Sequence, residues 1–411
     1  MPTSKNVAQA DISITKKQAG RFLLLKQLLF RPRAKLSGSA GIDTVFRRLG
    51  AIQFDPLSPC GNNVDLVLQS RVKGIKKSDY HEWVYEKRQG IEIYQKELCI
   101  VPLENIGLAR GPHTKRGVAR VNSFFAQNEA DLKGLLDFIK GNGPISARDI
   151  DDERRLISFW GNNTSWGRTA LHILWQFGEL CVVGRDRNRK SYDLSRRAYG
   201  LDLKRSYPVE TTRIQQEHVL GRMDNVGLLP STGTGSGWLR TGTGKEIKSI
   251  LTKLANRGDI KTVAIDGVSG NYVLRDKDLP LLEAAQRKRI TKRVSFIAPL
   301  DNLMWDRNTI KEIFNFDYCW EVYTPVEQRT YGYYVLPVLF GEKFIGRIEP
   351  AVNPDTNVLE IKGFWLENGT VWTPLLRKKF DEYLEHFLAY LEVRDIIWKV
   401  PQPEEGKEYR T

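Results

Sequence analysis

The same order of helices and extended segments recurs three times in the first 290 residues, and this repeat constrains the fold more than any other feature. In the first copy, residues 13–29 and 42–49 carry apolar side chains at helical spacing, and Gly50 ends the second helix. Residues 51–57 and 64–72 then look extended. Helix, turn, helix and a two-stranded ribbon make the order of a winged helix-turn-helix module.

Two further copies follow the same order. The second has a helix over residues 129–140, a turn into a short helix at 143–149, a helix over 168–177, and a hairpin of 180–183 with 191–194. The third has helices over residues 216–226 and 246–256 and a ribbon of 260–265 with 272–274. The copies share a pattern and little residue identity, and they predict three modules of roughly 70–100 residues each.

After residue 293 the sequence pattern changes to runs that are rich in aromatic residues and alternate between apolar and polar side chains. The predicted strands cover residues 294–297, 320–323, 331–340, 343–349 and 358–365. Thr373 and Pro374 then open a closing helix. The predicted fold class is α+β, with three tandem winged helix-turn-helix modules followed by a small C-terminal β-barrel, or a sandwich, and the closing helix. The predicted domains are residues 1–125, 126–208, 209–289 and 290–411.

The positive charge of the chain lies in its first two thirds. Residues 1–285 hold 45 Lys and Arg against 30 Asp and Glu, whereas residues 286–411 hold 18 against 19. This excess predicts an anionic partner for the modules, and winged modules bind duplex DNA through phosphate contacts. The candidate contacts are Arg47, Arg48, Arg71, Lys73, Lys76, Lys77, Arg148, Arg185, Arg187, Arg189 and Lys190. Any one of them is equally well explained as a solvated surface charge, but jointly they favour duplex binding.

Other classes of protein are disfavoured. The four cysteines (Cys60, Cys99, Cys181 and Cys319) form no CxxC pair, and we predict that they are buried thiols. Because the five histidines are also scattered, we predict no metal site. The Gly-rich segment 231–245 fails as a P-loop, because Leu239 and Glu246 stand where Gly and Ser or Thr are needed, so we predict no cofactor. A polar N-terminus and the absence of an apolar run of about 18 residues predict no membrane span and a cytoplasmic, nucleoid-associated protein.

Gln53-Phe54-Asp55 is the strongest candidate for chemistry. In a strand, residues two apart share a face, so the Gln53 carboxamide and the Asp55 carboxylate would project together and could position and activate a water. Taken alone, an Asp-Pro pair after a short apolar run is more typical of a turn.

Several motifs together resemble those of the AlkZ/YcaQ-type winged-helix DNA glycosylases, a bacterial family that excises alkylated bases and unhooks interstrand crosslinks. The motifs are residues 53–55 (QFD), 143–149 (GPISARD), 178–180 (GEL), 301–307 (DNLMWDR) and 331–339 (YGYYVLPVL). The resemblance covers nearly the whole chain and implies three winged helices and a β-barrel around a DNA channel. The family's catalytic motif is Gln, an apolar residue, then Gln or Asp, and this chain has the Asp form.

Lys96 departs from the family pattern, in which a His often takes its place. The resemblance therefore leaves three roles open for Lys96: a phosphate contact, a purely structural residue, or an amine nucleophile that forms a Schiff base with the opened sugar.

The resemblance implies a monofunctional DNA glycosylase that hydrolyses the N-glycosidic bond of N7-alkylated purines, with interstrand crosslinks as a second substrate class. Because an N7-alkylated purine is already cationic, one carboxylate can suffice, with Asp55 as the base and Gln53 holding the water. The alternative is a non-catalytic winged-helix DNA-binding protein, such as a transcription regulator. We expect a monomer that binds double-stranded DNA carrying alkylated bases or crosslinks.

Overall fold

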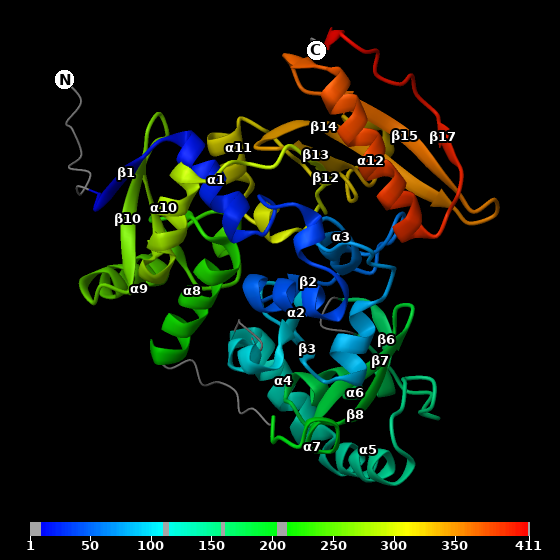
Figure 1. The fold of residues 1–411 in the computed structure, drawn as a ribbon. Coiled ribbons are helices and arrows are strands. Elements are labelled where there is room, and N and C mark those ends of the chain that lie inside the picture. The colour runs from blue at the N-terminus through cyan, green and yellow to red at the C-terminus, as the bar shows by residue number, and fades with distance from the viewer. Residues whose placement is uncertain (1–9, 110–114, 158–160, 204–211, 410–411) are drawn as a thin grey trace. The chain divides into compact units, whose positions relative to one another are not determined.

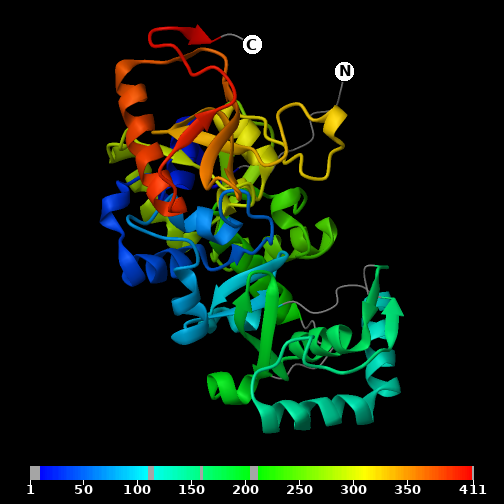
Figure 2. The same cartoon turned by 90° about the vertical axis from the view of Figure 1, so that its right-hand side faces the viewer.

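The computed structural model describes residues 10–109, 115–157, 161–203 and 212–409 (Figures 1 and 2). The chain divides into two compact units, one formed by residues 1–80 with 215–411 and the other by residues 81–214. Both mix helices and strands, which confirms the α+β class. The winged-helix assignment and the four predicted domain boundaries stay predictions.

The first unit begins with helices that lead to the QFD segment. Their bounds are α1 (Lys16–Lys26), α2 (Gly38–Leu49), β2 (Ile52–Gln53) and α3 (Asn63–Gln69). The extended segment predicted for residues 64–72 is wrong. Residues 64–69 belong to α3, and residues 70–72 form the turn after it. The Asn62 side chain caps α3 by accepting from the Asp65 backbone N–H, and every residue of the helix is buried. A helix buried on all sides shows no polar face, so its sequence looks like that of a buried strand.

The third predicted copy forms helices and a four-stranded sheet in the first unit. The helices are α8 (Thr212–Val226), α9 (Gly244–Asn256) and α10 (Leu279–Arg287), and the strands follow the order β1 (Ile12–Ile14), β10 (Ile260–Ile265), β11 (Asn271–Arg275) and β9 (Leu229–Pro230). The predicted hairpin of β10 and β11 is confirmed. The sequence did not predict that β1, from the start of the chain, pairs with β10 in parallel.

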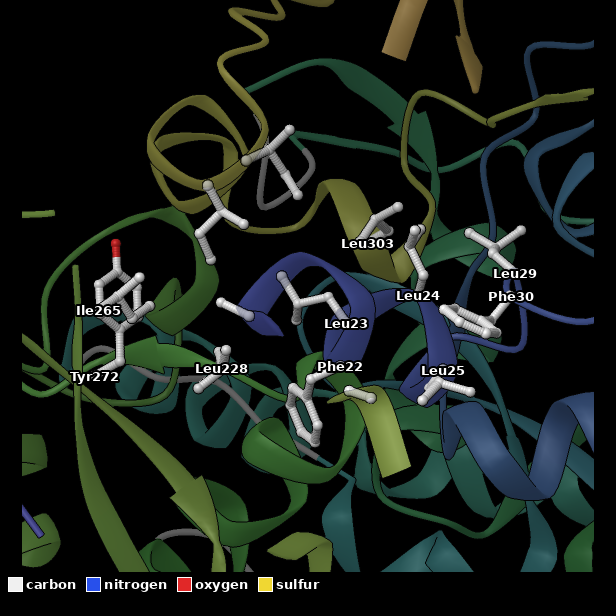
Figure 3. Close-up of a cluster of buried hydrophobic side chains, with 14 of the residues drawn as sticks. Phe22, Leu23, Leu24, Leu25, Leu29, Phe30, Leu228, Ile265, Tyr272 and Leu303 are labelled. Atoms are coloured by element: carbon white, nitrogen blue, oxygen red, sulfur yellow. The ribbon is translucent and has the colours of Figure 1, made fainter. Parts of the chain in front are cut away.

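Helix α1 is the centre of the core of this unit (Figure 3). Phe22 and the three leucines that follow it are buried among Leu228, Tyr272 and Leu303, which come from the loop before β9, the β11 strand and the DNLMWDR segment. The first and last thirds of the sequence therefore share one hydrophobic core. The hydrophobic effect that stabilises the start of the chain depends on residues more than 200 positions away.

The C-terminal strands form an open five-stranded sheet. Its order is β12 (Val294–Phe296), β13 (Leu336–Phe340), β14 (Lys343–Asn353), β15 (Val358–Leu366) and β17 (Ile396–Trp398). The predicted barrel is wrong, since within the described residues β12 and β17 lie at opposite edges and do not pair. The predicted closing helix is α12 (Pro374–Leu391), and its Phe380, Tyr383 and Phe387 pack on Phe296 of the sheet. The strand predicted for residues 320–323 is also wrong, because these residues lie in a loop.

In its described residues, the second unit contains three antiparallel strand pairs, β3 with β4, β5 with β6 and β7 with β8, and several helices. Its elements are β3 (Gly90–Tyr94), β4 (Leu98–Pro102), α4 (Lys115–Gln127), α5 (Glu129–Asn142), β5 (Arg155–Ile157), β6 (Asn163–Ser165), α6 (Trp166–Gln176), β7 (Leu180–Asp186), β8 (Arg189–Leu194) and α7 (Ser195–Tyr199). The helices and hairpin predicted for the second copy are confirmed as α5, α6, β7 and β8. The short helix predicted at residues 143–149 is absent there, and the segment is a turn whose Ile145 bridges to Tyr192 of β8.

Two further expectations can be compared with the structure. No helix in the described part of the chain is long and apolar enough to cross a membrane. Cys60, Cys99 and Cys181 are buried as expected, but the prediction for Cys319 is wrong, because its side chain is exposed.

A fully buried ion pair joins distant segments of the first unit. Arg71, just after α3, donates to Asp301 through both terminal nitrogens, at 2.7 and 2.9 Å, and its Nε donates to the carbonyl of Gln27 at 2.7 Å. Both side chains of the pair are completely buried. Removing one partner would leave an uncompensated charge in the interior, where solvation is lost.

We expect Arg71→Met to lower the free energy of unfolding by about 3–5 kcal/mol, because Asp301 would remain buried and unpaired. Urea unfolding followed by circular dichroism measures the loss. The double variant Arg71→Met with Asp301→Leu should recover much of it, and Arg48→Met, at an exposed arginine, should change stability by less than about 0.5 kcal/mol. Equal stability of Arg71→Met and wild type would contradict the assigned role of the pair.

Candidate active site and basic pocket

The backbone that leads into Asp55 is set by the end of α2. Gly50 adopts the left-handed conformation with φ of 68°, and its N–H donates to the carbonyl of Phe46 at 2.8 Å. A side chain at this position would make the conformation costly, so glycine suits the turn from α2 into β2. Ile52 and Phe54 are buried behind the segment.

Three buried asparagines hold alternate carbonyls of this segment. The hydrogen bonds run from Asn225 Nδ2 to Leu49 O at 2.8 Å, from Asn302 Nδ2 to Ala51 O at 2.8 Å, and from Asn63 Nδ2 to Gln53 O at 2.7 Å. The asparagines come from α8, the DNLMWDR segment and α3, which lie far apart in the sequence. Sequence reasoning quoted Asn302 only as part of a motif and missed the other two, since no local pattern reveals a contact with a remote carbonyl.

Gln53 offers a free acceptor in a buried place. Its side chain is 7% exposed, and Oε1 has no hydrogen-bond partner within the described residues. A buried amide oxygen without a partner costs free energy unless a bound molecule satisfies it. This oxygen is therefore placed to accept a hydrogen bond from a water.

Asp55 lies beyond the strand, because β2 ends at Gln53. Its Oδ1 accepts the N–H of Leu57 at 2.9 Å, which is the turn expected of an Asp-Pro pair. The shared-face argument for Gln53 and Asp55 is therefore not confirmed, although both side chains remain candidates. The carboxylate has no ion-pair partner among the residues described, and burial raises the pKa of Asp55 above its ordinary value, which makes it a stronger base.

Lys96 belongs to the other unit, in the turn between β3 and β4. Its side chain is only 8% exposed, and its backbone N–H donates to Gln95 Oε1 at 3.0 Å. The structure places it in a buried polar turn. The three roles left open for Lys96 stay predictions.

The second unit contains a basic pocket of about 620 Å³. Its lining comprises Tyr94, Ala147, Arg148, Thr164, Arg168, Thr169, His172, Asn188, Arg189, Lys190 and Tyr192. Three of these residues (Arg148, Arg189 and Lys190) were predicted as phosphate contacts, and the fold brings them together from two separate segments. Arg168 in the first turn of α6 is exposed and was missed, because a single arginine in a predicted helix gives no local sign that it lines a pocket.

The cations of the pocket are not all neutralised. Arg148 and Arg168 have no ion-pair partner in the part of the chain that is described, and Arg189 lies 3.6 Å from Asp186. Burial lowers the pKa of His172 to about 4, so its imidazole is neutral at pH 7 and can both donate and accept a hydrogen bond. Cations, hydroxyl groups and aromatic rings in one pocket suit a phosphate with its attached sugar or base.

A buried carboxylate, Glu92, lies near Lys190 of this pocket. Glu92 accepts from Arg185 Nε and Nη2, both at 2.6 Å, and from Tyr85 Oη at 2.5 Å. Burial alone would raise the pKa of Glu92, but the Arg185 guanidinium and the other donors more than offset it, so its pKa is lowered. Lys190 Nζ lies 3.9 Å from Glu92 Oε2 and 3.7 Å from the centroid of the Trp175 ring. Burial lowers the pKa of Lys190 to about 8.

Two predicted phosphate contacts are wrong. Arg71 is 1% exposed and paired with Asp301, and the Arg185 side chain is 2% exposed and paired with Glu92. Their charges are already compensated inside the protein, so neither can reach a phosphate. The remaining candidates are exposed, namely Arg47 beside Asp43, Lys76 beside Glu392, and Arg48, Lys73, Lys77 and Arg187, and their role in phosphate contacts stays a prediction.

The chain thus has an α+β fold, with Gln53 and Asp55 in one unit and a basic pocket in the other. Comparisons with known proteins agree with this fold. A model of the family described as DNA glycosylase AlkZ-like matches residues 46–390, which is most of the chain. The chain therefore belongs to the AlkZ-like DNA glycosylase family, and the resemblance drawn from its motifs is confirmed. The solved structure of the Streptomyces sahachiroi DNA glycosylase AlkZ is similar in fold, with a TM-score of 0.59 and 15% identity over 94% of this chain and 100% of that chain.

We expect Arg168→Gln to weaken binding to an undamaged DNA duplex and to reduce the slope of log affinity against log salt by about one, because one phosphate contact is lost. Fluorescence anisotropy between about 50 and 200 mM salt measures both quantities. Arg196→Gln serves as the control, since Arg196 is an exposed arginine of the same unit that pairs with Asp202 outside the pocket. An unchanged salt slope in Arg168→Gln would remove the pocket from the DNA interface.

Proposed function

We propose that this protein is a monofunctional DNA glycosylase that hydrolyses the N-glycosidic bond of N7-alkylated purines in double-stranded DNA. The observation that supports it most is the buried Gln53 Oε1, which has no hydrogen-bond partner among the described residues and lies two positions before Asp55, a carboxylate without an ion-pair partner there. A family of DNA glycosylases supplies the reaction class, and these two groups supply a site for the attacking water.

The chemistry follows from the charge of the leaving group. In an N7-alkylated guanine the C1′–N9 bond breaks with its electron pair going to the cationic base, which leaves as a neutral molecule without protonation. The sugar then carries oxocarbenium character at C1′, which the Asp55 carboxylate stabilises electrostatically. A water held by Gln53 Oε1 attacks C1′, its proton passes to Asp55, and the products are the free base and an abasic site.

The raised pKa of Asp55 fits this role as long as the group is ionised at working pH. A carboxylate that is partly desolvated is a better proton acceptor than one in water, and it meets less screening when it faces a developing positive charge. The bonds from the three asparagines fix the backbone from Leu49 to Gln53, so little reorganisation of the Gln53 backbone is needed during the reaction.

Interstrand crosslinks are a second substrate class under the same proposal. A guanine that is alkylated at N7 by a crosslink has the same cationic leaving group, so the chemistry at C1′ does not change. Such a base is tethered to both strands and cannot swing fully out of the helix, so it needs an active site that reaches the duplex. The exposed turn around Pro56 and Ser58, beside Asp55, provides such access.

The alternative function is a non-catalytic DNA-binding protein. Binding alone has no use for an uncompensated carboxylate near phosphates, where like charge weakens association. Retained DNA binding without any base release would favour this alternative over the enzyme.

We expect Asp55→Asn to reduce single-turnover release of N7-methylguanine by about 10²–10⁴-fold, because the general base is lost. The change is nearly isosteric, and DNA affinity should be kept or increased. If wild type releases no base from a monoadduct or from a nitrogen-mustard crosslink, the proposed activity is wrong. If Asp55→Asn is as fast as wild type, the activity stands but Asp55 is not the base.

We expect base release to fall as pH is lowered, because protonation of Asp55 removes the base. Since burial raises its pKa, the midpoint of this acid limb should lie above about 3.9, the ordinary value of an aspartate side chain. The positive charge of N7-methylguanine is fixed by alkylation, so the substrate does not titrate in this range. Gln53→Ala should lower the rate at every pH and leave the midpoint in place, and a pH-independent rate in wild type would contradict the assignment.

A further inference from the structure

Two short segments of the first unit are strongly basic and contain no acidic residue. Residues 29–36 (LFRPRAKL) follow α1, and residues 287–293 (RKRITKR) begin at the end of α10. The fold brings them together, and the N–H of Thr291 donates to the carbonyl of Phe30 at 3.5 Å. We refer to their cations as the basic patch, which comprises Arg31, Arg33, Lys35, Arg287, Lys288, Arg289, Lys292 and Arg293. None of them is among the phosphate contacts predicted from the sequence.

Four exposed cations of the basic patch border a pocket of about 280 Å³ between the two segments. They are Arg31, Lys35, Lys288 and Arg289. None of the four forms an ion pair within the part of the chain that the structure describes. Like charges that are gathered around one pocket repel each other, so the free protein carries a cost here that a bound anion would remove.

Two further arginines of the patch are turned inward and also lack a carboxylate partner in the described residues. Arg33 Nη2 donates to the Val72 carbonyl at 2.9 Å, and Arg293 Nη1 donates to the Ser70 carbonyl at 2.8 Å. The Nε atoms of both arginines are buried without a hydrogen-bond partner among the described residues. Burial lowers the pKa of Arg33, and burial with the guanidinium groups of Arg33 and Arg71 lowers the pKa of Arg293 to about 9. The positive charge therefore extends from the surface into the interior.

The amount of charge indicates which kind of anion fits. A single phosphate group carries a charge of about −1.5 to −2 at pH 7, which is too little to neutralise the basic patch. Duplex DNA carries one negative charge for about every 1.7 Å of its axis, so it presents several phosphates to a surface of this kind. Arginine also binds phosphate oxygens in a bidentate geometry. Because the chain belongs to a family of DNA glycosylases, DNA is the polyanion that it meets.

We propose that the basic patch is a second binding site for the phosphate backbone of duplex DNA, in the unit that contains the QFD segment. Lys73 extends this site, because its backbone N–H donates to the Leu36 carbonyl at 2.8 Å and its side chain is exposed. The basic pocket around Arg168 belongs to the other unit, so each unit has a phosphate site of its own. The patch goes beyond the proposed activity, since it requires neither a damaged base nor base release.

The uncompensated charge links DNA binding to the stability of the free protein. If the cations of the patch repel each other, removing two of them stabilises the protein without DNA and weakens its complex with DNA. Solvated surface charges would have little effect on either quantity, and cations that hold the fold together would lower stability when removed. Opposite changes in stability and affinity are therefore the signature of this site.

The variant Lys288→Gln with Arg289→Gln tests the patch in the whole chain. Fluorescence anisotropy should show about 3- to 30-fold weaker binding to an undamaged duplex in about 100 mM salt, with the slope of log affinity against log salt reduced by about two. The thermal unfolding midpoint without DNA should rise by about 1–2 °C. Lys362→Gln with Arg394→Gln is the matched control. It removes two exposed cations on β15 and just before β17, towards the edge of the sheet opposite to β12, and should keep the salt slope.

Three results would overturn the proposal. The first is an affinity and a salt slope equal to those of wild type. The second is polyglutamate, with as many charges as the duplex, that binds wild type as tightly as the duplex and loses the same affinity in the variant, because the patch then fits an acidic polypeptide. The third is a lower unfolding midpoint in the variant, which would show that the cations stabilise the fold.

The test also separates the basic patch from the proposed activity. If wild type releases no base but duplex binding depends on Lys288 and Arg289, the patch stands and the glycosylase proposal fails. If base is released and the variant binds the duplex as wild type does, the activity stands and the patch is overturned. Inorganic phosphate that raises the unfolding midpoint of wild type in that second case would identify a site for a small anion only.

Discussion

The buried pair of Arg71 and Asp301 is the interaction on which the position of the QFD segment depends. It ties the end of α3 to the DNLMWDR segment, 230 residues further along the chain. The next residue, Asn302, holds the carbonyl of Ala51, and α3 supplies Asn63, which holds that of Gln53. A buried pair contributes little net stability, since desolvation offsets the attraction. Its value here is positional, because a shift of either partner would displace an asparagine that holds the backbone leading to Gln53 and Asp55.

Arginine side chains serve two purposes in this protein, and only burial distinguishes them. Arg71 and Arg185 are paired with buried carboxylates and organise the interior, whereas Arg148 and Arg168 have no ion-pair partner in the described residues and line an open pocket. Local sequence cannot separate these cases, because the partner of Arg71 lies 230 residues away. Counting charges therefore could not separate the exposed arginines from Arg71 and Arg185, whose charges are compensated inside the protein.

The sequence predicted those parts of the fold whose signals are local. Helices with one apolar face and hairpins between turn residues were recovered in the second and third copies, since their periodicity survives in the residues themselves. Helix α3 was missed because it is buried all round, and β1 because its pairing with β10 spans some 250 residues. The site followed the same division. Gln53 and Asp55 came from a motif, while the three asparagines that hold the segment act on remote carbonyls and leave no local signal.

Residues 319–334, the loop before β13, show why an alternating aromatic segment can be misread as a strand. Alternating aromatic residues at 320–323 are typical of a half-buried strand, but Glu321 satisfies backbone N–H groups that a strand would have paired, and Tyr323 is left outside. Folding alone gains nothing from exposing that ring, and a flexible loop would let it collapse onto the surface. A backbone fixed by the carboxylates of Glu321 and Glu349 keeps the Tyr323 ring exposed, and the entropy of ordering this loop is lost when the chain folds.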